Sequence, residues 1–503
     1  MPEIHAHHRR QNAVGMKNRI IEKTGILARP RTILFDADHL WVRFVGDDAA
    51  SRAGYEIQHF TDDMELRRCY EYADPGTKAL WIIDAPDMYI PQDIARQYYI
   101  CRLSFQSIFP TLDADALRAL PNIDYGLLSS CADIAALRPM TKEATERLCR
   151  QGMLSAEYAR PYGQGLLSDA VAMAANAESH RDWNEIAQRF GRAAMIQHTI
   201  GALDDYEQKR TAIETAFVQW ISTHYRMLSG TIDRARPILL SKAADFIRKG
   251  NSKIALIVMD GMSFENLYTI QQSLAAARLT LDIQSSFSFF PTVTSVARQS
   301  IFSGKLPREH DKPFSLDNEE KQWRAYWQAS GYKPAEIYFG KTETPDVPPQ
   351  AKIAGIVINI CDDLMHAELQ GLRGMAQGIT EWMASGILPN LIRDLLVRNF
   401  AVYMTSDHGN TSAIAQGRFT KPGLLAEPAS RRAVIYKDYA DAIELAKFTT
   451  MRYDNTYLPD GINTYLFGQD ACYGDTGREY ITHGGMTLEE AIVPFVRIGA
   501  YDG

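Results

Sequence analysis

The sequence lacks long apolar runs, a signal peptide and a glycine-rich phosphate loop. No apolar stretch approaches the roughly 18 residues that a membrane-spanning helix requires. The segment at the start, MPEIHAHHRRQN, is too polar for a signal peptide. We therefore expect a cytoplasmic protein that makes no contact with a membrane.

Paired cysteines are also missing. The six cysteines show no CxxC motif and no regular spacing, which argues against a zinc ribbon or a disulfide framework. The formal net charge of -7 argues against a protein that coats nucleic acid through counterion release alone. This charge excludes neither a local cationic groove nor a nucleotide substrate.

The chain contains several parts with different patterns. Its 503 residues suffice for about three domains at roughly 100 to 200 residues each. In chain order we predict a mobile polar arm over 1–28, a small parallel α/β domain over 29–130, a helical domain or bridge over 131–250, and a larger α/β domain over 251–503. Polar insertions near 305–350 and 411–480 follow strands of the last part, so we expect them to cap its site.

Alternating apolar segments support the prediction of the first α/β domain. Strands are expected at TILFDAD, YEIQHF and KALWIIDAP, and helices at MELRRCYEY and IARQYYICRL. Asp36, Asp38 and Asp84 follow the ends of these strands and resemble the acidic cluster of a phospho-receiver domain. Aspartate is also common at strand exits and turns, so a purely structural role stays open.

In the last part, polar side chains stand where short apolar runs end. They are Asp260 after IALIVM, Thr294 in PTVT, Asp362 and His366 after KIAGIVINI, Asp407 and His408 after AVYMTS, and His483 in THGG before AIVPFVRI. Open α/β sheets bind ligands outside the carboxyl ends of their strands. We therefore predict that these oxygen and nitrogen donors meet at one edge of a sheet.

These residue types suit phosphoryl transfer. Two cations about 4 Å apart can hold a phosphoryl group in line with a nucleophile and neutralise its charge, and carboxylates and imidazoles are suitable ligands for them. A threonine hydroxyl is a poor nucleophile at neutral pH, so Thr294 would need coordination to one of the cations. We also expect Thr294 at the start of a helix, where free backbone N–H groups favour a phosphate.

Other polar residues near these positions could contact the substrate. Arg298 lies four residues after Thr294 on the same helical face, and it is our candidate for a phosphate clamp, with an exposed helix position as the alternative. Further cations close to the nucleophile in sequence are Lys305, Arg308 and Lys312. Ser406 and Asn410 flank a ligand pair, and we interpret them as supports for the ligands rather than substrate contacts.

The motifs together resemble a known family. Residues 253–503 look like the alkaline phosphatase superfamily, specifically its PglZ branch, in the segments MDGMS, PT-x-T-x(3)-R, Asp-x-x-x-His, SDHG and HGGMTLEEAIVP. Upstream, LSFQSIFPTLDADALRALP and FVQWISTHYRMLSG look like the amino-terminal portion of PglZ proteins from type 3 BREX phage-exclusion systems. The resemblance implies an alkaline phosphatase-like three-layer sandwich, preceded by a small parallel α/β domain and a helical domain.

A ligand set follows from the same resemblance. One metal ion would be held by Asp362, His366 and His483, and the other by Asp260, Asp407, His408 and the Thr294 oxygen. Zinc suits both sets, whereas manganese and magnesium suit them less because imidazole is softer than these ions prefer. We therefore expect two divalent cations, with zinc favoured.

The resemblance also implies a function and leaves alternatives open. It implies a two-metal phosphoric ester hydrolase that acts through a phosphothreonine intermediate in a bacterial BREX-like phage-defence system, with other defence proteins as partners. The segment Pro291-Thr292-Val293-Thr294 resembles nucleotide phosphodiesterases of the same superfamily, which favours diesters of nucleotides or oligonucleotides. The alternatives are a phosphomonoesterase, a phosphomutase or phosphotransferase, and a non-catalytic scaffold subunit. The oligomeric state stays open.

Overall fold

The computed structural model describes residues 13–85, 87–120, 123–150, 152–201, 203–367, 370–419, 430–437, 442–468 and 470–500. The chain divides into two compact units, Met1–Tyr162 together with Gly503, and Gly163–Asp502. This boundary falls within the region predicted as a helical domain, and the predicted borders near 28, 130 and 250 stay predictions. None of the described helices is both long and apolar enough to cross a membrane.

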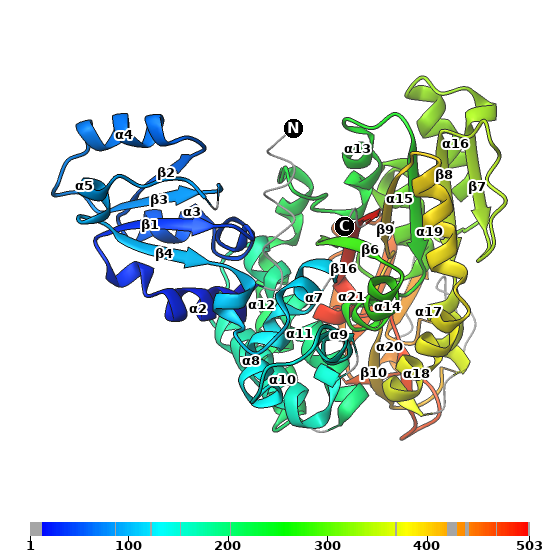
Figure 1. Cartoon of the computed structure of the whole chain (residues 1–503). Coiled ribbons are helices and arrows are strands. Elements are labelled where there is room, and N and C mark those ends of the chain that lie inside the picture. The colour runs from blue at the N-terminus through cyan, green and yellow to red at the C-terminus, as the bar shows by residue number, and fades with distance from the viewer. Residues whose placement is uncertain are drawn as a thin grey trace. The chain divides into compact units, whose positions relative to one another are not determined.

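The first unit is built on a parallel sheet of four strands in the order β2-β3-β1-β4 (Figure 1). Its strands are β1 (Arg31–Asp36), β2 (Glu56–Phe60), β3 (Ala79–Ile83) and β4 (Tyr99–Leu103). Its helices are α2 (Ala13–Thr24), α3 (Asp47–Arg52), α4 (Asp63–Tyr72), α5 (Gln92–Ala95), α6 (Phe105–Ile108), α7 (Ala114–Ala119), α8 (Tyr125–Ala135) and α9 (Lys142–Arg150), and the unit boundary falls within α10 (Ala156–Ala174). The two central strands, β1 and β3, are almost completely buried, which explains their continuous apolar sequence.

A helix occupies part of the segment that was predicted as a mobile arm. α2 begins at Ala13, and its side chains Met16 and Ile20 are fully buried. Arg19 donates two hydrogen bonds of 2.7 and 2.8 Å to the Asp133 carboxylate. The buried apolar side chains and the paired guanidinium explain why this polar-looking sequence packs as a helix. The rest of the predicted arm before Ala13 lies outside the described residues.

The segment IARQYYICRL differs from its predicted structure. The helix α5 (Gln92–Ala95) ends at the second residue of this segment. Tyr99–Leu103 forms the edge strand β4, which pairs in parallel with β1. Cys101 and Leu103 are buried, whereas Tyr99 and Ile100 are exposed. This alternation and the pairing with β1 outweigh the local helical pattern. The prediction of a helix over the whole segment was therefore wrong.

The second unit contains a mixed sheet of six strands in the order β6-β16-β9-β5-β8-β7. Its strands are β5 (Ile254–Met259), β6 (Leu279–Phe287), β7 (Ile337–Lys341), β8 (Ile353–Ile358), β9 (Ala401–Thr405) and β16 (Ile492–Ala500). Four of them, β9, β5, β8 and β7, run parallel, and β16 is antiparallel to both of its neighbours. Every residue of β5 and β8 is buried, as in strands that are covered on both faces. The predicted α/β class is confirmed.

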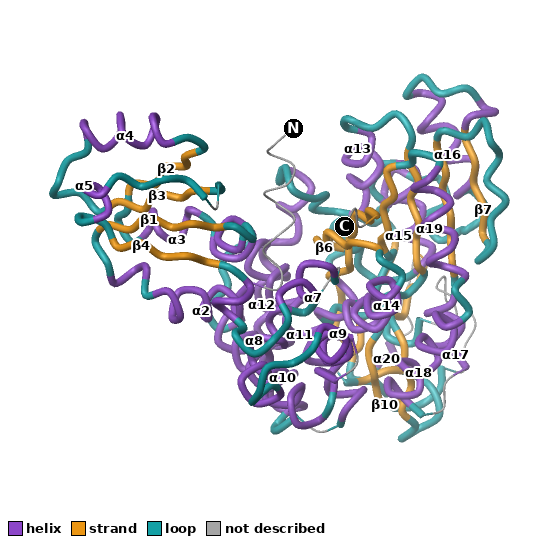
Figure 2. Tube along the Cα trace, in the orientation of Figure 1, coloured by secondary structure: helices purple, strands orange, loops and turns teal. Residues whose placement is uncertain are grey.

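Helices surround the strands of this sheet, as Figure 2 shows with helices in purple and strands in orange. The α-helices of the second unit after α10 are α11 (His180–Ile200), α12 (Tyr206–His224), α13 (Ala243–Arg248), α14 (Phe264–Ala276), α15 (Thr294–Ser303), α16 (Glu319–Ala329), α17 (Ile360–Ala367), α18 (Gly371–Ala384), α19 (Ile387–Val397), α20 (Ala442–Leu445) and α21 (Leu488–Ala491). α11, α14 and α18 pack against one another, and α15 packs against α13 and α16.

The two predicted insertions have different structures. Residues 305–350 supply α16 and the edge strand β7, so they extend the main sheet instead of forming a separate cap, because β7 pairs with β8. The described residues of 411–480 form strands of two small sheets, β14-β10-β15 and β11-β13-β12. These strands are β10 (Thr411–Ala415), β11 (Ala433–Lys437), β12 (Thr450–Tyr453), β13 (Ile462–Phe467), β14 (Ala471–Cys472) and β15 (Glu479–Thr482).

Candidate metal centre

The carboxyl ends of three neighbouring parallel strands bring most of the predicted ligands together. Asp260 directly follows β5, and Asp407 and His408 follow β9. β8 is followed by α17, which carries Asp362 and His366 on successive turns. Since β9, β5 and β8 are adjacent and parallel, these segments leave the sheet at the same edge.

The first group of donors consists of Asp362, His366 and His483, whose ligand atoms all lie within 4.8 Å of one another. Asp362 Oδ1 and His366 Nε2 are 3.2 Å apart across one turn of α17. His483 follows β15 and is fully buried. One carboxylate and two imidazoles are a suitable protein contribution to a zinc site that keeps one position open.

His483 is held in the state that binds a metal. Its Nδ1 lies 2.8 Å from the Thr292 carbonyl, and because a carbonyl only accepts, Nδ1 carries the hydrogen and Nε2 keeps its lone pair. The Nε2 atom has no hydrogen-bond partner among the described residues. Burial, with a contribution from neighbouring His408, lowers the pKa of His483 well below its usual value, so the ring is neutral at neutral pH.

The second group consists of Asp260, Asp407 and His408, again with ligand atoms within 4.8 Å of one another. His408 Nε2 lies 3.9 Å from Asp260 Oδ1 and 3.7 Å from Asp407 Oδ2. Donors around a tetrahedral ion at about 2.0–2.2 Å are separated by on the order of 3.4 Å. The spacing of these three atoms is therefore close to that of a metal site.

Electrostatics in this second group call for a positive charge. Both aspartates are buried, and neither Asp260 Oδ1 nor Asp407 Oδ2 has a hydrogen-bond partner among the described residues. Burial raises the pKa of Asp407 to about 6. Burial and then the adjacent Asp407 raise the pKa of Asp260 well above its usual value. A cation between the two carboxylates would relieve both the desolvation and their mutual repulsion.

Thr294 lies at the second group and begins α15. Its Oγ1 is 2.9 Å from His408 Nε2. His408 Nδ1 faces the Gly409 carbonyl at 2.9 Å, so Nδ1 donates and Nε2 accepts the hydrogen bond from the threonine hydroxyl. The rings of His408 and His483 stack with their centroids 3.9 Å apart, which makes the two groups of donors neighbours. The structure thus brings together all of the predicted ligands and the predicted nucleophile.

The loops that carry the aspartates are fastened to each other by short contacts. Gly261, with a φ of 72°, donates its N–H to Asp407 Oδ1 at 3.1 Å. Ser406 Oγ accepts the Met262 N–H at 2.8 Å, and Asn410 donates to the Gly261 carbonyl at 2.7 Å. These contacts agree with the interpretation of Ser406 and Asn410 as supports, which stays a prediction.

The sequence left two interpretations of Arg298, a phosphate clamp and an exposed helix position. Arg298 is 3% exposed, so the alternative of an exposed helix position was wrong. Its Nη1 donates to Asp260 Oδ2, and its Nε donates to Glu319 Oε1 at 2.7 Å. In this structure the guanidinium is occupied by two carboxylates, and a role as phosphate clamp stays a prediction.

The other predicted cations are not all near the nucleophile. α15 is 10 residues long, so its ends are separated by roughly 15 Å. Lys305 follows the carboxyl end of this helix, whereas Thr294 begins it. Closeness in sequence was misleading here because a helix carries the chain away from its own start.

Two residues near the centre carried no signal in the sequence. Glu319, the first residue of α16, is fully buried, and its Oε2 lies 2.5 Å from Lys341 Nζ. Both residues belong to the segment that was predicted as a polar cap, where acidic and basic residues are common. Their place beside Arg298 depends on how α16 and β7 pack in the sheet.

Comparisons with known proteins give one family match and several similar solved structures. The family model described as "BREX system PglZ alkaline phosphatase-like domain" matches residues 238–498. No curated protein matches the chain. Among solved structures, murine ectonucleotide pyrophosphatase/phosphodiesterase 5 is similar at 13% identity over 48% of this chain and 87% of that chain, with a TM-score of 0.34. The human counterpart is similar at 14% identity over 48% and 87%, with a TM-score of 0.30.

Proposed function

The chain belongs to the family of BREX-system PglZ alkaline phosphatase-like domains, and on that premise we propose that it hydrolyses phosphoric esters with two divalent cations and Thr294 as the nucleophile. One observation carries this proposal. Three buried donor atoms without a hydrogen-bond partner among the described residues, Asp260 Oδ1, Asp407 Oδ2 and His483 Nε2, belong to two adjacent groups beside the threonine hydroxyl.

The donor sets fit two metal ions. Asp362, His366 and His483 would hold one ion, with one carboxylate and two imidazoles. Asp260, Asp407 and His408 would hold the other, with two carboxylates and one imidazole. Mixed carboxylate and imidazole donors favour zinc over magnesium, which prefers oxygen. When bound, the cations supply positive charge at the phosphoryl group and lower the pKa of hydroxyl groups and water in the site.

In the proposed reaction Thr294 forms the covalent intermediate. The hydroxyl gives up its proton and its oxygen forms a bond to phosphorus while the bond from phosphorus to the leaving oxygen breaks, and the leaving oxygen takes up a proton. Water then attacks the phosphothreonine, which releases the phosphate product and restores the threonine hydroxyl. Thr294 Oγ1 lies 2.9 Å from His408 Nε2, so the hydroxyl stands beside the donors that would hold the second cation, and the positive end of α15 favours the phosphate.

We favour a phosphodiester of a nucleotide or oligonucleotide as the substrate. A monoester carries a dianionic phosphoryl group, and enzymes usually add cations around it. Arg298, the cation on the helix of Thr294 that was predicted to do this, donates instead to Asp260 and Glu319. A diester, with one negative charge, demands less additional charge. Family membership further supports action within a phage-defence system, together with other defence proteins.

The test compares two model substrates on protein loaded with two equivalents of zinc. We expect bis-nitrophenyl phosphate to be hydrolysed with a higher kcat/KM than nitrophenyl phosphate. We expect kcat of the Thr294→Ala variant to fall by about 1000-fold or more, because the nucleophile is missing. Elemental analysis should still find both metal ions in this variant.

Each other outcome has a defined meaning. A hundredfold preference for the monoester would reverse the substrate assignment, and full activity of Thr294→Ala would reject the nucleophile. Transfer of the phosphoryl group to an added alcohol without release of phosphate would identify a phosphotransferase. Two bound metal ions without hydrolysis of either ester would favour a scaffold subunit.

A further inference from the structure

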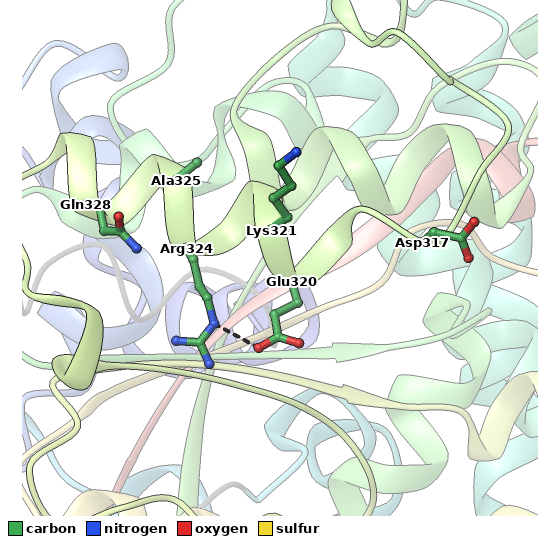
Figure 3. Close-up of a pocket in the computed structure, with 6 residues that line it drawn as sticks. All are labelled: Asp317, Glu320, Lys321, Arg324, Ala325 and Gln328. Atoms are coloured by element: carbon green, nitrogen blue, oxygen red, sulfur yellow. Dashed lines mark hydrogen bonds and ion pairs between the residues drawn. The ribbon is translucent and has the colours of Figure 1, made fainter.

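Neighbouring glutamates at the start of α16 face different environments. Glu319 is fully buried, together with Trp323 and Trp327 on the same helix. Glu320 is exposed and accepts a hydrogen bond of 2.8 Å from Arg324. Figure 3 shows this ion pair among the side chains that line a pocket along α16. One turn of chain therefore offers a buried acidic side chain and an exposed one for comparison.

Glu319 is part of a chain of alternating charges that ends at the metal centre. Lys341 Nζ, partly exposed at the end of β7, lies 2.5 Å from Glu319 Oε2. Glu319 Oε1 accepts a hydrogen bond of 2.7 Å from Arg298 Nε, and Arg298 Nη1 donates to Asp260 Oδ2. The guanidinium of Arg298 therefore lies between the carboxylates of Asp260 and Glu319. A buried charge requires such partners.

The contacts define which oxygen of Asp260 is free. Oδ2 accepts from Arg298, whereas Oδ1 has no hydrogen-bond partner among the described residues and lies 3.9 Å from His408 Nε2. The guanidinium is a rigid planar fork, so fixing its Nε edge also fixes the direction of Nη1. Glu319 holds that edge. Its position therefore determines the orientation of a ligand that it does not touch.

We propose that Glu319 is a positioning residue for the second metal ion, an inference that rests on the proposed function. It holds Arg298 against Oδ2 of Asp260, so that Oδ1 faces the cation between Asp260, Asp407 and His408. Without the Glu319 charge, Arg298 is free to turn away, and Asp260 loses the contact that sets its rotation. In this arrangement Arg298 orients a metal ligand and does not bind the phosphate of the substrate.

The decisive experiment is a zinc titration of metal-free protein by competition with a chromogenic chelator, with Glu319→Gln compared with Glu320→Gln. We expect Glu319→Gln to weaken one of the two zinc equivalents by roughly 10- to 100-fold, the usual effect of removing a group that orients a ligand, and to leave the other equivalent unchanged. Glu320→Gln should bind both equivalents as the wild type does. Unchanged affinity of both equivalents in Glu319→Gln would overturn the proposal.

A second variant keeps the test decisive if Glu319→Gln fails to fold, as judged by circular dichroism and thermal unfolding. Arg298→Lys keeps the charge but has a single donor group, which cannot span Asp260 and Glu319 in a fixed plane. Positioning predicts that one zinc equivalent again weakens by roughly 10-fold or more. A phosphate clamp predicts instead wild-type zinc affinity and a weaker inhibition by inorganic phosphate, and this result would overturn the proposal.

The titration does not depend on catalysis, so the two proposals fail in different ways. If the wild-type protein binds fewer than two zinc ions, the proposed function fails. If the wild-type protein binds two zinc ions but Glu319→Gln and Arg298→Lys do so equally well, only the positioning role fails. A loss of kcat at unchanged KM in zinc-saturated Glu319→Gln would add support, because orientation of Asp260 affects the reacting group rather than substrate binding.

Discussion

Each unit has a buried aspartate at the carboxyl end of a strand, but the carboxylate oxygens of the two side chains have different surroundings. Asp36 ends β1 and Asp407 follows β9, and both are fully buried. Burial raises the pKa of each carboxyl to about 6. By position, burial and pKa direction the two are therefore alike.

The difference lies in where the carboxylate oxygens find partners. Asp36 accepts the backbone N–H of Leu40 at 2.7 Å on Oδ1 and that of Trp41 at 2.8 Å on Oδ2, so both oxygens close the turn after the strand. Asp407 accepts on Oδ1 from Gly261, whereas its Oδ2 has no partner among the described residues. An unpartnered buried oxygen is not enough by itself, because Asp84 Oδ1 in the first unit also has no hydrogen-bond partner among the described residues. Asp407 differs because its unpartnered oxygen belongs to a group of three donors that could hold a metal ion.

The neighbouring side chains reinforce this distinction. Asp407 faces Asp260 and His408 in a group that could hold a metal, and within the described residues both such groups lie in the second unit. In the first unit, Asp38 accepts from the Phe105 N–H at 2.8 Å and from Arg118 Nε at 2.7 Å. Asp36 and Asp38 are thus occupied by contacts within the fold, whereas Asp84 Oδ1 has no hydrogen-bond partner among the described residues, so the partners of two of the three aspartates favour the structural interpretation over a receiver-like site.

The largest expected effect is the difference between two variants in which one of these aspartates is neutralised. Asp407→Asn removes one anionic ligand, so we expect the second metal ion to be lost. We expect kcat/KM for the diester to fall by about 1000-fold or more, which corresponds to a rise of roughly 4 kcal/mol in the activation free energy. Asp36→Asn should keep both metal ions and wild-type kcat/KM, because Asp36 belongs to the first unit. Metal analysis and steady-state kinetics on the two variants measure the contrast. Equal losses in both would remove the distinction between them.

Chelation of the metal ions should affect the two units unequally. A ligand that binds only the folded state at 1000 times its Kd stabilises that state by about 4 kcal/mol. On removal of metal with a chelator we expect faster hydrogen exchange in β5 and β9, whose carboxyl ends carry the ligands, and unchanged exchange in β1 and β3. Exchange measured by mass spectrometry reports each segment separately. Loss of protection in β1 to the same extent would show that the units do not respond independently.

The sequence was sufficient to predict which side chains meet at the edge of the sheet and insufficient for what surrounds them. Asp260, Asp362 and Asp407 could be predicted because each follows an apolar run that is buried as a central strand, and neighbouring parallel strands deliver their ends to one edge. Glu319 could not, because its role depends on α16 packing beside α15, a contact between distant segments. The same cause explains β4, whose pairing with β1 outweighed its local helical pattern.

The smallest effect concerns the pH dependence of stability, and it isolates Asp36. Its pKa rises from 3.8 in the unfolded chain to about 6 in the fold, so the native state binds more protons between these values. Stability from this group is therefore present at low pH and is lost as pH rises through about 6. Between pH 5 and pH 7.5 this amounts to about 1 kcal/mol.

Urea unfolding of wild type and Asp36→Asn at these two pH values measures this contribution. We expect the free energy of unfolding of the wild type to fall by about 1 kcal/mol more than that of the variant on going from pH 5 to pH 7.5. The variant has no titrating group at this position, so other groups contribute equally to both proteins and cancel in the difference. An equal pH response would mean that the Asp36 carboxyl is not desolvated as its burial in the turn implies.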